Sequence, residues 1–187
     1  MWWPENRALL RRSARLAVVF LAAGLTTACF QPLYGDRSVG GVGLGDQLGG
    51  VDVMQIDAAN GTRESRLSVE LRNALMYDLS AGAEPGSPTH RLKVQLRGTR
   101  TSVIIDPTTA RPDVENYGID ATYTLTEIGT GKVVVRGTTF ARVSYDVPGQ
   151  QQRYARARGL RDAENRATKV ISEQIRSRLA SYFVAGT

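Results

Sequence analysis

The sequence predicts an α+β fold in which two helices pack on one face of a mostly antiparallel four-stranded sheet. Two observations lead to this prediction. Segments 63–79 and 154–183 carry apolar residues at the three-and-four spacing of amphipathic helices. The segments before and between them alternate apolar and polar side chains, as strands with one buried face do. The predicted order is strand, helix, three strands, helix, which favours helices on one side of the sheet.

The first 28 residues are predicted to be a signal peptide. A basic start with four arginines precedes thirteen mostly apolar residues, 16–28. That run is too short for a stable membrane anchor, which takes about 20 residues. Residues 25–29, Leu-Thr-Thr-Ala-Cys, resemble a bacterial lipobox, although Thr26 stands where leucine is usual. We therefore expect lipidation of Cys29, the only cysteine. An ordinary exported protein with a stray cysteine is the alternative.

Removal of the signal leaves 159 residues, enough for one compact domain. We expect residues 29–50 to be a lipid-anchored flexible tether, because residues 40–50 contain six glycines and few bulky side chains. A single α+β domain is expected to follow at 51–187. Removing residues 1–28 also lowers the net charge from +6 to +3, well short of a nucleic-acid-binding pattern. We expect no nucleic-acid partner.

The first strand and helix of this domain are predicted from local patterns. Residues 51–56 alternate apolar and polar, which indicates a short strand. Thr62 suits the N-cap of the helix over 63–79, whose leucines at 67, 71, 75 and 79 form one apolar stripe. Residues 80–88 are rich in glycine and proline, so a loop is expected there.

Three strands are predicted next. The first alternates over 92–96 and is expected to continue past Gly98 to Ile105, with a loop over 106–113 because of two prolines. The second, 117–125, has the most regular alternation. Gly-Thr-Gly at 129–131 predicts a hairpin turn into a third strand, 132–145. Phe140 breaks the parity of that strand, so we expect a bulge near Gly137.

The last predicted element is the long helix over 154–183. Its alanines indicate close packing against the sheet or the other helix. The predicted buried stripe consists of Leu160, Ala163, Ala167, Val170, Ile171, Gln174, Ile175, Leu179, Tyr182 and Phe183.

No catalytic constellation is visible in the sequence. His90 is the only histidine and has no cysteines or carboxylates at ligand spacing, which argues against a metal site. No Gly-x-Ser-x-Gly motif occurs. We therefore expect no cofactor and a protein that is not an enzyme, with an exported enzyme of unknown type as a remote alternative.

Basic side chains on the predicted strands are the candidate binding residues. Alternation places them on the sheet face away from the helices, where they could bind an anionic ligand through charge-assisted hydrogen bonds. The alternative is that they are ordinary solvated residues of a half-exposed sheet. These candidates are Lys93, Arg97, Arg136 and Arg142.

Two stretches resemble a known family. Residues 29–35, Cys-Phe-Gln-Pro-Leu-Tyr-Gly, are similar to the mature start of LptE-type lipopolysaccharide-assembly lipoproteins. Residues 163–167 and 175–183 are similar to the last helix of that family, and the predicted order of elements agrees over nearly the whole mature chain.

The resemblance implies an outer-membrane lipoprotein on the periplasmic face, anchored by acyl chains such as palmitate on Cys29. It implies a plug and assembly partner of a β-barrel lipopolysaccharide-assembly protein, LptD-like, that helps deliver lipopolysaccharide to the outer leaflet. The four basic residues would then contact lipopolysaccharide. An auxiliary lipoprotein of another envelope lipid-transport system is the main alternative.

Overall fold

The computed structural model describes residues 43–80, 87–106, 111–148 and 152–185, all within one compact unit, Asp36–Thr187. The predicted signal peptide, the lipidation of Cys29 and the predicted tether up to residue 42 lie outside these residues. Among the described helices, none combines the length and apolar composition needed to cross a membrane. The elements are α2 Leu44–Gly49, β1 Val51–Val53, α3 Arg63–Ser80, β2 His90–Asp106, β3 Arg111–Glu127, β4 Val133–Asp146 and α4 Arg153–Ala185.

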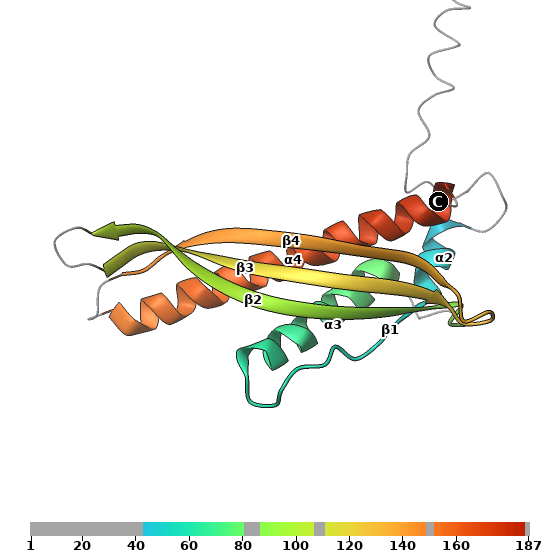
Figure 1. Cartoon of the computed structure of the whole chain (residues 1–187), viewed down its shortest axis with the longest axis horizontal. Helices are drawn as coiled ribbons and strands as arrows, with labels where there is room; N and C mark the ends of the chain where they lie inside the picture. Colours follow the sequence, from blue (N-terminus) through green and yellow to red (C-terminus); the bar gives the residue numbers. More distant parts are fainter. Residues whose placement is uncertain (1–42, 81–86, 107–110, 149–151, 186–187) are drawn as a thin grey trace, which may run out of the picture. The chain divides into compact units, whose positions relative to one another are not determined.

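The sheet has the order β1-β2-β3-β4, and α3 and α4 cover one of its faces (Figure 1). Strand β1 is parallel to β2, whereas β2 with β3 and β3 with β4 are antiparallel. The predicted α+β class and the mostly antiparallel sheet are therefore confirmed. Because β1 pairs only with residues 90–92 of β2, the sheet is in large part a three-stranded antiparallel meander.

The loop predicted over 106–113 is shorter than expected. Strand β3 begins at Arg111, and its backbone pairs with β2 through Pro112 opposite Ile105. Proline lacks an N–H and is tolerated where a strand needs no partner on one side. Pairing of β3 with β4 begins only at Val114, so Pro112 leaves no bond to β4 unmade. Pro112 therefore lies within β3 and not in the predicted loop.

The predicted bulge near Gly137 is wrong. Strand β4 pairs with β3 in unbroken register from Asp146 to Val135, and the shift falls beyond Leu125. Phe140 keeps the alternation by pointing away from the helices, where it is 65% exposed. Gly137 has a different use: a Cβ there would lie 2.6 Å from the hydroxyl oxygen of Tyr123, so glycine makes room for that ring.

The core lies between the sheet and the two long helices. The predicted leucine stripe of α3 is at most 3% exposed, and the alanines at 163, 167 and 180 of α4 are fully buried. This confirms the predicted close packing. Two members of the predicted α4 stripe, Val170 and Gln174, are instead exposed. Sheet residues that complete the core are Leu92, Val94, Tyr117, Ile119, Ala121, Tyr123 and Leu125.

Residues 44–49, which the sequence placed in the tether, form helix α2. Leu44 and Leu48, one helical turn apart, are 3% and 2% exposed, and α2 contacts both α3 and α4. The glycine content of this stretch predicted a lack of order. Two leucines at helical spacing are enough to hold the short helix against the core.

Candidate functional site

The sheet face that points away from α3 and α4 is the candidate site, and we call it the outer face. Strand register arranges its side chains in rows across β2, β3 and β4. Four successive rows are Lys93, Thr124 and Arg136; Gln95, Thr122 and Thr138; Arg97, Asp120 and Phe140; and Thr99, Gly118 and Arg142.

The structure places all four predicted basic residues on the outer face. Lys93 and Arg136 lie on either side of Thr124, two strand spacings or about 10 Å apart. Arg97 stands four residues further along β2, about 13 Å from Lys93. Within the described part of the chain, Lys93, Arg97 and Arg136 form no ion pair or side-chain hydrogen bond. Their charges are thus available to a ligand.

Arg142 differs from the other three because it is engaged within the face. Its Nη2 donates to Oδ1 of Asp120 at 2.8 Å, and its Nη1 donates to the carbonyl oxygens of Ile119 and Ala141 at 3.2 and 3.0 Å. Its guanidinium carbon also lies 5.5 Å from the centre of the Phe140 ring. Arg142 therefore shapes the face more than it offers a free charge.

Gly118 allows Arg142 to lie across the sheet. A Cβ at position 118 would come within 2.8 Å of Cδ and 2.9 Å of Nε of Arg142, closer than real side chains approach. The alternating pattern correctly predicted which face Arg142 occupies. It could not predict this arrangement, which depends on the residue directly across the strand pair.

Arg91 is a further basic residue that the sequence analysis did not select. It lies two residues before Lys93 on β2, and its Nε is 3.9 Å from Oδ2 of Asp52 on β1. Both side chains are about half exposed, so this ion pair is weak. The same strand alternation that selected Lys93 could have identified Arg91.

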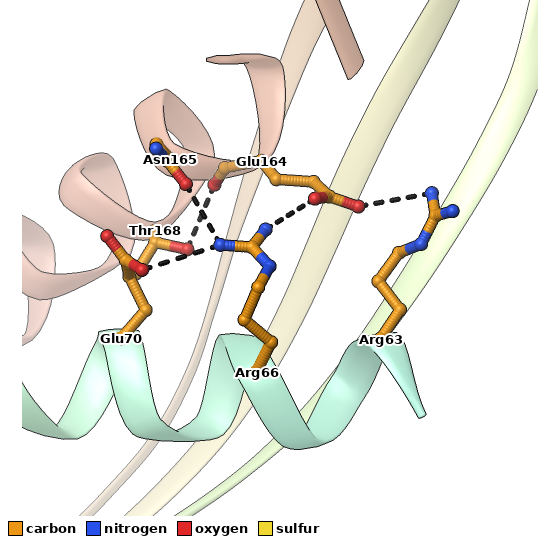
Figure 2. Close-up of polar contacts among 6 residues, drawn as sticks. All are labelled: Arg63, Arg66, Glu70, Glu164, Asn165 and Thr168. Carbon is orange, nitrogen blue, oxygen red and sulfur yellow. Dashed lines mark hydrogen bonds and ion pairs between the residues drawn. The ribbon is translucent and has the colours of Figure 1, made fainter. Parts of the chain in front are cut away.

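A buried carboxylate joins the two long helices on the side of the sheet opposite the outer face (Figure 2). The side chain of Glu164 on α4 is 4% exposed and pairs with two arginines of α3. Arg63 lies 3.1 Å from its Oε1, and Nη2 of Arg66 donates to its Oε2. Nη1 of Arg66 also donates to Asn165 at 3.2 Å and to Glu70 at 3.4 Å. This cluster fixes α3 against α4.

Two tyrosines lie beside buried carboxylates. Burial, and then the charges of Glu164 and Glu64, raise the pKa of Tyr117 to about 12. Its buried hydroxyl has no hydrogen-bond partner in the described structure. Burial and a hydrogen bond to Glu115 raise the pKa of Tyr145 to about 12 as well. These groups sit between the sheet and the helices, away from the outer face.

His90 has a structural setting. Its Nδ1 lies 2.9 Å from Oγ1 of Thr89, and its ring meets that of Phe183 edge-on with centres 5.1 Å apart. Burial lowers its pKa, although the charge of Glu127 acts in the opposite direction. The described residues contain no group of three or more histidines, cysteines and carboxylates that could hold a metal ion.

The sequence matches no model of a known protein family and no curated protein. Solved structures resemble the fold. A protein assigned as a lipoprotein from Caulobacter crescentus has a TM-score of 0.60 at 19% identity, covering 77% of this chain and 97% of that one. The rare lipoprotein B of Shewanella oneidensis has a TM-score of 0.50 at 13% identity, covering 72% and 98%. At these identities the likeness concerns the fold alone. The chain therefore has a fold that occurs in bacterial lipoproteins.

Proposed function

We propose that this chain is an outer-membrane lipoprotein on the periplasmic face, anchored by acyl chains such as palmitate on Cys29. It acts as plug and assembly partner of a β-barrel lipopolysaccharide-assembly protein, LptD-like, and helps deliver lipopolysaccharide to the outer leaflet. The proposed work is binding and assembly, without a catalytic step.

The arrangement of basic side chains on the outer face is the observation that supports binding of lipopolysaccharide. Lys93, Arg97 and Arg136 stand on one regular sheet surface, separated by threonine and glutamine side chains. Lipopolysaccharide carries phosphates, which basic side chains bind through charge-assisted hydrogen bonds. Three cations that lie about 10 to 16 Å from one another suit several phosphates on one headgroup better than a single small anion.

The helix layer supports the plug part. A barrel lumen is lined by polar residues, so a plug needs a rigid body with polar outer surfaces. The outward side of α4 carries Arg161, Asp162, Lys169 and Glu173, all exposed. The Glu164 cluster and the common core hold the helices and the sheet as one body. The outer face and the outward side of α4 thus both carry polar side chains, and a common buried core lies between the sheet and the helices.

The experiment combines purification and binding. The protein is purified from detergent-solubilised membranes, and a large outer-membrane barrel should copurify with it. The double variant Arg97→Glu/Arg136→Glu should keep the barrel but bind lipopolysaccharide more weakly, and rising salt should weaken wild-type binding. Arg161→Glu/Lys169→Glu on α4 makes the same charge change as a matched control and should keep lipopolysaccharide binding.

Two results would contradict the proposal. Copurification with an inner-membrane transporter instead of a barrel would favour another envelope lipid-transport system. Equal lipopolysaccharide affinity in the folded outer-face variant and the wild type would assign these cations to plain solvation.

A further inference from the structure

One aromatic side chain stands among polar residues in the central rows of the outer face. Phe140 is 65% exposed and is the only apolar side chain in the four rows described above. Single exposed apolar residues are common on protein surfaces, so exposure alone carries no argument. The fixed polar frame around this ring distinguishes it from the other exposed apolar residues.

The frame consists of Gly118, Asp120 and Arg142. Three hydrogen bonds and the ring contact hold the Arg142 guanidinium, and the missing side chain at Gly118 leaves the space it occupies. Fixing a long arginine side chain costs conformational entropy, whereas an arginine that is only solvated keeps its rotamer freedom. Asp120 uses Oδ1 for this pair, and its Oδ2 has no hydrogen-bond partner in the described structure.

These groups match the chemistry of a sugar ring. A pyranose presents C–H groups on its faces, which pack against an aromatic ring, and hydroxyls around its edge. A carboxylate oxygen accepts from such hydroxyls, and a guanidinium donates to them. Phe140 and Asp120 share one row with Arg97, so an apolar surface, an acceptor and a donor lie side by side.

We propose that Phe140 stacks on a sugar ring of a phosphorylated saccharide headgroup, with Asp120 bonding its hydroxyls. Lys93, Arg97 and Arg136 meet the phosphates of the same headgroup. Arg142 is a positioning residue that orients the ring and the carboxylate. This inference rests on the proposed function, because the headgroup belongs to the glycolipid named there. It adds that the sugar itself is recognised, and by which side chain.

The test separates sugar from phosphate. The protein purified from membranes is titrated with lipopolysaccharide deacylated by alkali, with the same saccharide after phosphatase treatment, and with inorganic pyrophosphate. Phe140→Ala should weaken binding of both saccharides roughly three- to ten-fold and leave pyrophosphate binding unchanged. Phe140→Tyr keeps the ring and should restore saccharide binding. Val133→Ala removes another exposed apolar side chain of β4 and should have no effect.

Two further variants report on the frame and the ring. Gly118→Ala should displace Arg142 and weaken binding of the dephosphorylated saccharide, while pyrophosphate binding stays unchanged. Phe140→Trp places an indole at the stacking position, and its fluorescence should change with the dephosphorylated saccharide. Trp2 and Trp3, in the expected signal peptide, are the only native tryptophans. Tyr77→Trp on α3, where the native side chain is 70% exposed, should show no change.

Equal saccharide affinity in Phe140→Ala and the wild type would overturn the inference while leaving lipopolysaccharide binding intact. An equal loss of pyrophosphate binding in Phe140→Ala would also overturn it, because the substitution would then disturb the outer face in general and not the contact with a sugar ring. Failure of the wild type to bind intact lipopolysaccharide would remove the ligand part of the proposed function itself. The two failures are thus distinguishable.

Discussion

In the Glu164 cluster, one substitution should either lower or raise the free energy of unfolding, depending on whether the neighbouring arginines are present. Glu164→Gln keeps the size of the side chain and removes its charge. In the wild type this change should destabilise the fold, because two arginines lose a carboxylate partner. In a chain that lacks both arginines the same change should stabilise the fold, because a buried charge without a cation disappears.

The magnitudes follow from exposure. The side chain of Arg63 is 40% exposed and that of Arg66 is 28% exposed, whereas Glu164 is 4% exposed. Arg63→Ala should cost about 0.5–1 kcal/mol, because solvent around the Arg63 side chain screens its attraction to Glu164. Arg66→Ala should cost about 1.5–3 kcal/mol, because a charge-assisted hydrogen bond to a buried group is lost. Together they leave the carboxylate alone and should cost about 3–5 kcal/mol.

Urea denaturation followed by circular dichroism measures each free energy of unfolding, on the chain from residue 29 with Cys29→Ser. Glu164→Gln in the double-alanine background should recover about 1–3 kcal/mol, which is the penalty of an unpaired buried polar or charged group. The exposed i,i+4 pair of Asp162 and Arg166 on the same helix is the control. Breaking it should cost under about 0.5 kcal/mol. If Glu164→Gln destabilises both backgrounds equally, the cluster does not act as described.

Three other predictions concern the core, the pH dependence and the anchor. Leu71→Ala should cost about 2–5 kcal/mol because Leu71 is 1% exposed, whereas Glu70→Ala should cost under about 0.5 kcal/mol; similar urea midpoints for the two would refute the described core. Burial raises the pKa of Tyr117 from 10.0 to about 12, so its contribution to the free energy of unfolding should be fully present below pH 10 and be lost from pH 10 to 12, because the tyrosine ionises first in the unfolded chain. Tyr117→Phe should make the fall in the free energy of unfolding over this range shallower, and an unchanged slope would contradict the burial argument. Cys29→Ser should abolish acylation, which mass spectrometry checks, and an unmodified Cys29 in the mature wild type would contradict the anchor.

Strand and helix periodicity predicted most of the fold, because burial of one face dictates the pattern. The leucine stripe of α3 and the regular alternation of β3 were correct for this reason. Two errors came from treating one residue as decisive. Phe140 was assumed to be buried because it is apolar, which required a bulge near Gly137, whereas the register shift of β4 lies between Val133 and Val135. Prolines were assumed to keep residues 106–113 in a loop, although β3 begins at Arg111 and has no β4 partner at Pro112.

For the candidate site, the sequence could predict only which side chains share a sheet face, because that follows from the alternation along a strand. Alternation placed Lys93, Arg97, Arg136 and Arg142 on one face, and the structure agrees with that placement. Arg142 is held by neighbours on the face, whereas the other three form no ion pair with the described residues. This difference depends on cross-strand neighbours far away in the sequence. The pairing of Glu164 with Arg66 joins residues 98 positions apart. A single sequence contains no local signal for such contacts.

Photo-crosslinking in cells tests the central claim most directly. A photoreactive amino acid replaces Thr122, which lies at the middle of the outer face between Gln95 and Thr138. A second chain carries it at Lys169, on the outward side of α4. The proposed function predicts that position 122 crosslinks to lipopolysaccharide and position 169 to a β-barrel protein. Crosslinks from position 122 to protein alone, with none to lipopolysaccharide, would contradict the claim that the outer face binds the lipid.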